Sequence, residues 1–351
     1  MLSGYAWVEM RVIDGSLGEG GGQVLRTALA LSLVSGEPFR IARIRARRPK
    51  PGLRHQHLAA VRAAAEVGAA EVVGAALGSQ ELTFWPRRVA GGTYRWDVGT
   101  AGSVSLVLQA VLPALVLASQ GSRVELSGGT HNPQAPPYEF LDRVLLPVLR
   151  EMGVGVRARL ERYGFYPAGG GRMVVEVEPA RRLRPLVLSS RGPLGGWEAV
   201  ALFSRLPAQV AVRELAVVRQ RLGWGEEVCR AREVPSPGPG NALLLAVWGE
   251  GFSEVVTAFG RRGVPAEEVA REAAEAMARF LTLEVPVGEH LADQLLPYLA
   301  LAGGGRFRTL PLSLHARTVI EVVKAFFPVE VLLSQLPSGA EEVEVVAGEV
   351  A

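Results

Sequence analysis

Cysteine and lysine are almost absent from this sequence of 351 residues. The single cysteine, Cys229, excludes an intrachain disulfide and argues against a zinc site built on thiolates. Chains without disulfides are typical of a reducing compartment, so we expect a cytoplasmic location. Only Lys50 and Lys324 are lysines, and the other 36 of the 38 basic residues are arginines. A GC-rich genome is the simplest explanation, although arginine also forms two-pronged contacts with phosphates.

Long hydrophobic runs are also absent. No stretch of about 18 uncharged apolar residues occurs, so we expect no membrane-spanning helix and no membrane partner. The first 15 residues lack the basic, apolar and small-residue regions of a signal peptide. The chain is nevertheless 48% hydrophobic, which is enough apolar material for one large domain or two medium ones.

Basic residues gather in one segment, although the net charge of the chain is only +3. Residues 40–57, "RIARIRARRPKPGLRHQH", contain six arginines, one lysine and no acidic residue. Such a segment is most often a solvated face. This one follows closely on a glycine-rich turn, which favours a polyanionic partner.

One order of helices and strands occurs three times along the chain. A glycine-rich turn, an apolar helix, a second turn and a strand occupy residues 20–45, and residues 99–129 and 290–313 repeat that order. Each copy is followed by a second helix and two further strands. We therefore predict an α+β protein of three repeated β-α-β-α-β-β units that share a core, each a sheet with two helices on one face.

The third unit is interrupted. Its opening strand is expected at 184–190, whereas its first helix begins near His290. The residues between them contain three strand-like runs and two helical runs, which indicates a small α+β domain inserted into the third repeat. The predicted boundaries are 1–186 for the first part of the core, 187–284 for the insert and 285–351 for the rest of the core.

Glu19 lies inside a glycine-rich turn, "GEGGG", that leads into an apolar helix. Turns of this kind usually receive phosphate, which a carboxylate would repel. A divalent cation between the two resolves the conflict, because Mg²⁺ binds one or two carboxylates together with phosphate oxygens. The alternative is that Glu19 only stabilises the start of the helix. The turn has neither the GK[ST] of a P-loop nor the G-x-G-x-x-G of a dinucleotide-binding turn.

His315 precedes an apolar helical run and is expected in the first turn of that helix. A helix N-terminus disfavours the imidazolium form and attracts phosphate, so a neutral imidazole there is suited to attack phosphorus. His55 and His57 are spaced like two metal ligands, but no third ligand lies nearby in the sequence. His131 and His290 lie in polar segments near the boundaries of the repeats.

Five stretches together resemble the RNA 3'-terminal phosphate cyclases, and the similarity runs over nearly the whole chain. They are "DGSLGEGGGQVLRTALALS", "RARRPKPGLRHQHLAAV", "GFYPAGGGR", "HLADQLLPYLALAGGG" and "SLHART". The resemblance implies three repeats like the C-terminal domain of a translation initiation factor, with an inserted thioredoxin-like domain. It also implies ATP-dependent conversion of an RNA 3'-phosphate to a 2',3'-cyclic phosphate through a covalent His-AMP and an RNA-adenylate.

The resemblance also implies roles for individual residues. His315 matches the adenylylated nucleophile, and Glu19 matches the carboxylate that holds Mg²⁺ or Mn²⁺ at the triphosphate. The positions that match the nucleotide-binding set are Gln56, His57, Gln109, Pro136, His290, Asp293 and Gln294. Three basic residues match positions suited to the triphosphate or to the RNA terminal phosphate: Arg26, Arg45 and Arg48.

The sequence departs from the family at three positions. Val319 stands where asparagine is common, His290 where an aromatic residue often lies against the base, and His55 where arginine is expected. These changes bear on the shape of the nucleotide pocket and leave the chemistry in place.

Three other functions fit the sequence less well. Cyclase-like proteins that assist ribosomal RNA processing lack the nucleophilic histidine, so His315 argues against that function. Carboxyvinyl transferases of the related repeat fold have no inserted domain of this kind and no need of His315. A pure RNA-binding module would bind RNA with or without ATP, and its affinity would fall with added salt. The expected partners are ATP and RNA with a 3'-terminal phosphate, and the sequence predicts no oligomeric state.

Overall fold

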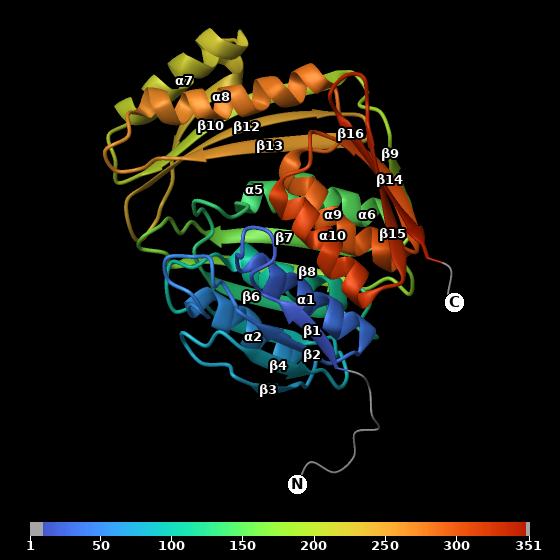
Figure 1. Ribbon diagram of the computed structural model, residues 1–351. Coiled ribbons are helices and arrows are strands. Elements are labelled where there is room, and N and C mark those ends of the chain that lie inside the picture. The colour runs from blue at the N-terminus through green and yellow to red at the C-terminus, as the bar shows by residue number, and fades with distance from the viewer. Residues whose placement is uncertain (1–9, 349–351) are drawn as a thin grey trace.

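The computed structural model describes residues 10–348, which form four sheets of four strands each together with the helices that cover them (Figure 1). The predicted α+β class is therefore confirmed. Among these residues, no helix combines the length and the apolar character needed to cross a membrane.

The first sheet has the strand order β1-β2-β4-β3. β1 is parallel to β2, and β4 is antiparallel to both of its neighbours. Two helices follow in this part of the chain, α1 after the glycine-rich turn and α2 after the arginine-rich segment. The bounds are β1 Arg11–Asp14, α1 Gln23–Ser35, β2 Phe39–Ala42, α2 His55–Val67, β3 Glu71–Val73 and β4 Leu82–Trp85.

Two further sheets have the same strand order and the same strand senses as the first. They are β5-β6-β8-β7 and β9-β14-β16-β15. The second comprises β5 Thr93–Asp97, α3 Val104–Gln109, α4 Leu112–Leu115, β6 Ser122–Gly128, α5 Tyr138–Phe140, the π-helical turn η1 Leu141–Leu145, α6 Leu146–Glu151, β7 Gly155–Arg162 and β8 Gly171–Glu178. The third comprises β9 Leu186–Leu188, α9 Glu289–Ala302, β14 Gly304–Thr309, α10 Leu314–Phe326, β15 Val329–Gln335 and β16 Glu341–Ala347.

The first helix expected in the second unit is broken into two short helices. Val111 leaves the helical conformation, with φ −125°, two residues before Pro113. A proline cannot donate a helical hydrogen bond and its ring crowds the preceding turn, so the break falls just before it. The expected second helix is likewise divided, because the turn Leu141–Leu145 widens to π-helical geometry.

The fourth sheet has the order β11-β10-β12-β13 and carries α7 and α8 on one face. The sequence predicts three of its strands and both helices but misses β13, where polar residues interrupt the apolar pattern. The bounds are β10 Leu194–Ser204, α7 Gln209–Leu222, the 3-10 turn η2 Glu226–Val228, β11 Cys229–Glu233, β12 Gly240–Gly249, β13 Phe252–Phe259 and α8 Ala266–Leu283.

Both faces of the fourth sheet are buried, which explains why β12 is apolar almost throughout. Leu243 and Leu245 point into the cluster beneath α7 and α8. Leu244 and Ala246 alternate with them and join the main core cluster, which also contains Leu141 of η1. The fourth sheet therefore packs between its own helices and the helices of the core, as its place above α5 and α9 in Figure 1 shows.

Candidate active site

The glycine-rich turn before α1 is packed too closely against its neighbours for side chains to fit. Gly18 has φ +57°, and a Cβ there would lie 1.9 Å from Oγ1 of Thr318 in α10. A Cβ on Gly22 would lie 2.2 Å from Nε2 of His57 in α2. The glycines thus let the turn that contains Glu19 approach both α2 and α10.

Glu19 lies between an arginine and the histidine of the predicted mechanism. Its Oε2 accepts a hydrogen bond from Nη2 of Arg48 at 2.9 Å, and its Oε1 lies 3.0 Å from Nδ1 of His315. His315 is in the first turn of α10, as the sequence predicts, and Ser313 caps that helix by accepting from the N–H of Ala316. Nδ1, and not Nε2, is therefore the ring nitrogen that faces Glu19.

Cations surround His57 without matching anions. Burial first, and then Arg26, Arg45 and Arg54, lower the pKa of His57 to about 3. Its Nδ1 accepts the backbone N–H of Arg54 at 3.1 Å, so the ring is a neutral acceptor that fixes the start of α2. Burial lowers the pKa of Arg26 to about 10, against the opposing effect of Asp293. The site therefore holds positive charge, buried at Arg26 and partly or fully exposed at Arg45 and Arg54, that Asp293 neutralises only in part.

The side chain of Arg45 is hydrogen-bonded to the backbone of the arginine-rich loop that contains it. Its Nη1 donates to the carbonyl oxygens of Lys50 at 2.6 Å and Gly52 at 2.9 Å, and its backbone takes the left-handed conformation with φ +54°. Burial, Arg54 and Arg48 lower the pKa of Arg45. Arg45 thus shapes the arginine-rich loop while adding to its charge.

Asp293 and Gln109 close the inner end of the site. Asp293 Oδ2 accepts from Nε2 of Gln23 at 3.0 Å, and Gln109 Oε1 accepts from Nε of Arg26 at 3.0 Å. Burial raises the pKa of Asp293 to about 7, which Arg26 opposes, and its Oδ1 has no hydrogen-bond partner among residues 10–348. An unpaired buried oxygen beside a cavity is a group that a ligand donor would satisfy.

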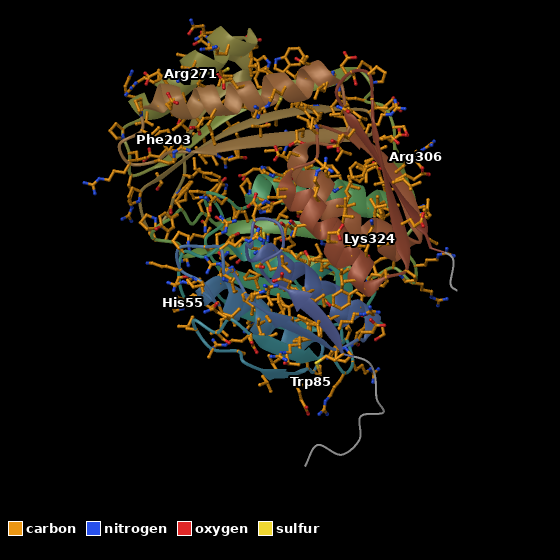
Figure 2. The ribbon with its side chains drawn as sticks, in the orientation of Figure 1. His55, Trp85, Phe203, Arg271, Arg306 and Lys324 are labelled. Atoms are coloured by element: carbon orange, nitrogen blue, oxygen red, sulfur yellow. The ribbon has the colours of Figure 1, made fainter. Side chains whose placement is uncertain are left out.

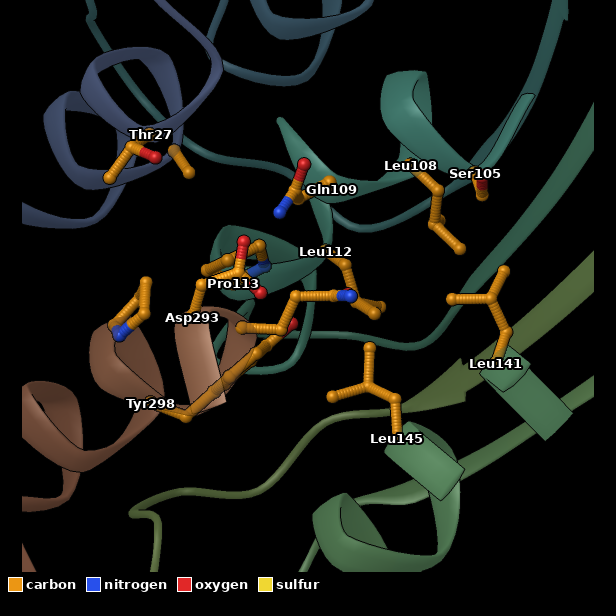
Figure 3. A pocket seen from close by; sticks show the side chains of 13 residues that line it. Thr27, Ser105, Leu108, Gln109, Leu112, Pro113, Leu141, Leu145, Asp293 and Tyr298 are labelled. Atoms are coloured by element: carbon orange, nitrogen blue, oxygen red, sulfur yellow. The ribbon is translucent and has the colours of Figure 1, made fainter. Parts of the chain in front are cut away.

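A pocket opens beside this polar cluster (Figure 3). Thr27 of α1, Gln109 and Leu112, Leu141 and Leu145 of η1, and Asp293 of α9 surround it in Figure 3. The complete lining is Thr27, Ala30, Ser105, Leu108, Gln109, Leu112, Pro113, Leu141, Leu145, Asp293, Gln294, Pro297 and Tyr298. An apolar pocket with a few convergent polar groups is the usual form of a small-molecule site.

Gln56 and Pro136 are joined through the serines that begin α3. Gln56 Oε1 accepts the backbone N–H of Ser103 at 3.1 Å, and the Ser105 hydroxyl donates to the carbonyl of Pro136 at 2.6 Å. The two serine hydroxyls lie 2.7 Å apart. These bonds connect α2, α3 and the segment before α5 at the edge of the pocket.

His290 stands near His315 at the start of α9. Desolvation lowers the pKa of His290, Glu289 opposes that effect, and the nearby His315 adds to it. The ring of His290 meets Phe140 edge-on at 6.4 Å. Gln294 follows one turn later and donates from Nε2 to the His290 carbonyl at 3.2 Å.

Some of the histidines lie outside this cluster. His55 is exposed at the surface (Figure 2), and no group of three or more His, Cys, Asp or Glu suited to a metal occurs within the described chain. His131 is buried, with Nε2 2.7 Å from Glu139 Oε2 and Nδ1 2.9 Å from Thr130 Oγ1.

The sequence prediction missed three residues that build the site. Gln23 donates to Asp293, Arg54 lowers the pKa of His57, and Thr318 packs against Gly18. A signal existed for each, because Gln23 and Arg54 are polar residues at the starts of apolar helices and Thr318 lies one turn after His315. Only the folded chain shows which of the neighbouring polar residues turn inward.

Comparison with known proteins identifies the family of this chain. The model of the family described as "RNA 3'-terminal phosphate cyclase" matches residues 17–333. The chain belongs to this family. Among relatives named RNA 3'-terminal phosphate cyclase, that of Koribacter versatilis is 50% identical over 336 residues, 95% of each chain. That of Ectopseudomonas mendocina is 48% identical over 324 residues, 92% of this chain and 94% of the relative.

A third cyclase of the family, from Ralstonia nicotianae, is 51% identical over 321 residues, 91% of this chain and 92% of the relative. The solved enolpyruvyl transferase NikO from Streptomyces tendae aligns with 97% of this chain and 50% of its own, at 14% identity and a TM-score of 0.39. That score is too low to bear on fold or function.

Proposed function

We propose that this protein is an ATP-dependent enzyme that converts an RNA 3'-terminal phosphate into a 2',3'-cyclic phosphate, with His315 as its nucleophile. The observation that carries the proposal is the position of His315, at the N-terminus of α10 with Nδ1 directed to Glu19. The buried Arg26 and the half-buried Arg45 supply the positive charge that a triphosphate requires. Membership of the cyclase family is consistent with both.

The reaction takes three balanced steps. Nε2 of His315 attacks the α-phosphorus of ATP, a P–N bond forms, and the bond to the β-phosphate oxygen breaks to release pyrophosphate. An oxygen of the RNA 3'-phosphate then displaces His315, giving RNA-adenylate. Finally the neighbouring 2'-OH loses its proton and attacks the RNA phosphorus, expelling AMP. Positioning and charge neutralisation are the main contributions of the protein.

Glu19 is the residue that fits a divalent cation. It is a single carboxylate at a phosphate site, and Mg²⁺ or Mn²⁺ often binds one protein carboxylate together with phosphate oxygens. Such an ion would neutralise charge on the triphosphate. The two carboxylate oxygens of Glu19 face Arg48 and His315, so Glu19 also orients the histidine ring.

The nucleotide residues are assigned by their surroundings. We place the base near Pro136, His290 and Gln294, and the phosphates toward Arg26 and Arg48. Gln56, His57 and Gln109 hold this arrangement from α2 and α3, and Asp293 offers its unpaired oxygen. The RNA terminal phosphate would share the arginines of the same cluster.

The architecture is proposed as three copies of one unit with a thioredoxin-like domain inserted in the third. The shared strand order of three sheets supports the copies, and the fourth sheet supports the insert. Because Val187 and Leu188 pair with β14, the insert begins after residue 188, two residues later than the sequence suggests. We retain a cytoplasmic location as part of the proposal.

The test uses ATP labelled at the α-phosphate. Purified protein is incubated with Mg²⁺ and labelled ATP, denatured, and examined for label. A P–N bond should be lost in acid and survive alkali, and His315→Ala should abolish it. His55→Ala is the matched control, because His55 is exposed at the start of α2 and should label normally.

Failure has a clear meaning. Label that persists in His315→Ala would overturn the assignment of the nucleophile. If wild-type protein shows no label, the non-catalytic cyclase-like function becomes the better proposal. RNA binding that is unchanged by ATP would then separate a pure RNA-binding module from both.

A further inference from the structure

The fourth sheet contacts the core at the two walls of the nucleotide pocket. One wall is η1, which provides Leu141 and Leu145 to the pocket, and the other is α9, which provides Asp293. β13 runs beside η1 and α5, and residue Gly288 at the start of α9 lies against the same strand. Figure 1 shows β13 directly above α5 and α9.

The contact with η1 is an ion pair stacked on an indole ring. Nη1 of Arg143, the central residue of η1, lies 2.5 Å from Oε1 of Glu198 in β10. The same guanidinium sits 5.4 Å from the ring centre of Trp248 in β12. Both partners of Arg143 belong to the fourth sheet, and Arg143 lies between the two residues that line the pocket. A cation held by a carboxylate and an aromatic face has little freedom to move.

The contact with α9 is a buried carboxyl. Glu254 of β13 is 3% exposed, and a Cβ on Gly288 would lie 1.9 Å from its Oε2. Gly288 is the N-cap of α9, so the Glu254 carboxyl lies at the positive end of that helix. α9 carries His290, Asp293 and Gln294 within its first two turns, and its start therefore sets where those side chains lie.

The connection between β11 and β12 adds a third close contact. A Cβ on Gly238 would lie 2.3 Å from Cβ of Ala168, and one on Gly240 would lie 2.0 Å from the ring of Phe165. Both partners belong to the segment between β7 and β8 of the core. The fourth sheet thus contacts the core closely at three places. Such contacts can fix the positions of the core elements that they touch.

We propose that the domain formed by the fourth sheet positions the two walls of the nucleotide pocket, with Glu198 and Glu254 as its positioning residues. Glu198 acts through Arg143 on η1, and Glu254 acts through Gly288 on α9. This inference rests on the proposed function, since it assigns the pocket to ATP. The domain then contributes to ATP affinity without touching ATP.

The first experiment compares two ion pairs of the same domain. Glu198→Ala removes the partner of Arg143, whereas Glu267→Ala removes a pair between α8 and Arg213 of α7 that is equally close, at 2.6 and 2.7 Å, and remote from the pocket. In self-labelling, KM is the ATP concentration that gives half of the maximal labelling rate. Glu198→Ala should raise this KM about tenfold, the effect of a modest loss of positioning, and should leave the maximal labelling rate (kcat) nearly unchanged. Glu267→Ala should leave KM unchanged.

The second experiment compares two buried acids of the same domain. Glu254→Leu removes the carboxyl beside α9 and should raise the KM for ATP. Glu254→Gln keeps a carbonyl oxygen there, so its KM should stay close to that of wild type. Glu214→Leu is the control, because Glu214 is also buried but is bonded by Asn241 within the domain. Equal KM values for Glu254→Leu and Glu214→Leu would overturn the proposal.

Hydrogen exchange separates this inference from the proposed function, because it needs no nucleotide. Glu198→Ala and Glu254→Leu should speed amide exchange in η1 and in the first turns of α9, and the two controls should not. Exchange that rises equally in all four variants would show a loss of stability alone and would overturn the proposal. Absence of label in wild type would overturn the proposed function and leave this exchange result standing.

Discussion

The fourth sheet with its helices and the active-site cluster both bury ionisable groups, and burial affects the charges of those groups differently. In the domain, burial raises the pKa of Glu214 and of Glu254 to about 7. In the cluster, burial lowers the pKa of Arg26 only to about 10 and that of His57 to about 3. Near pH 7 both acids are about half protonated, and Asn241 donates a hydrogen bond to Glu214. Arg26 keeps its charge at every ordinary pH, and Asp293, whose own pKa burial raises to about 7, opposes that charge only in part, so a bound anion would stabilise it further.

The strongest test of this comparison is Arg26→Met. The variant should lose at least about 100-fold in the efficiency of self-labelling with ATP, because a buried cation facing phosphate has no substitute. Its melting temperature should stay the same or rise, since an incompletely neutralised buried charge is removed. Labelling kinetics and thermal unfolding of the same preparation measure both.

Arg182→Met is the control for Arg26→Met, because Arg182 is an exposed arginine outside the cluster. It should change neither quantity. A variant at Arg26 that unfolds at lower temperature and still labels normally would show that this arginine serves the fold.

The second test removes the charge of a buried acid in place of a buried arginine, by the substitution Glu214→Gln. The folded-state pKa of Glu214, about 7, lies above the ordinary value of 4.5, so its stabilising contribution is complete below about pH 4.5 and is lost as the pH rises through 7. Glutamine does not ionise, and it can pair with the unpartnered Oδ1 of Asn241. The free energy of unfolding of the variant should match that of wild type near pH 4.5. At pH 8 it should exceed the wild-type value by at most about 3 kcal/mol.

Chemical unfolding at pH 4.5, 6 and 8 measures this difference. Glu267→Gln is the comparison, because Glu267 is exposed and its pKa is lowered to about 2 by Arg213 and by its own backbone. The free energy of unfolding of Glu267→Gln, relative to wild type, should not rise with pH. A constant difference in the free energy of unfolding across the three pH values would mean that folding does not raise the pKa of the Glu214 carboxyl.

Much of this architecture follows from the sequence because its signals are local. Apolar spacing places α1, α2 and α10 within a few residues, and a glycine-rich turn marks where α1 begins. The first-turn position of His315 follows from its place just before an apolar run. The sequence does not predict β13, because Glu254 and Thr257 break its apolar pattern.

The contacts across the site could not be predicted in the same way. Glu19 contacts His315 across nearly the whole length of the chain, and Arg143 of η1 contacts Glu198 of the fourth sheet. Such pairs depend on how helices pack, which local patterns do not encode. The resemblance to the cyclases supplies the roles of Glu19 and His315, whereas the geometry adds that they face each other.

A smaller effect is expected from Gly18→Ala, which tests how closely the cluster is assembled. The added methyl group meets Thr318, and the left-handed backbone costs about 1 kcal/mol or more for alanine. Glu19 should shift away from His315, lowering the labelling rate about tenfold at saturating ATP. Gly36→Ala shares the left-handed conformation, with φ +73° and open space around it, so it should lose stability and keep its rate.

The smallest effect is expected where charges are already paired. On the outer face of the second sheet, Nε of Arg157 lies 2.6 Å from Glu176 and Nη1 of Arg123 lies 2.7 Å from the same carboxylate. Because these arginines are neutralised and exposed, Arg157→Gln should alter neither stability nor affinity for an RNA 3'-phosphate oligonucleotide. Binding titrations at several salt concentrations test this. A weaker affinity with a shallower salt slope would mean that RNA lies across this sheet, and the unmatched charge of the cluster would then not be the main attraction for RNA.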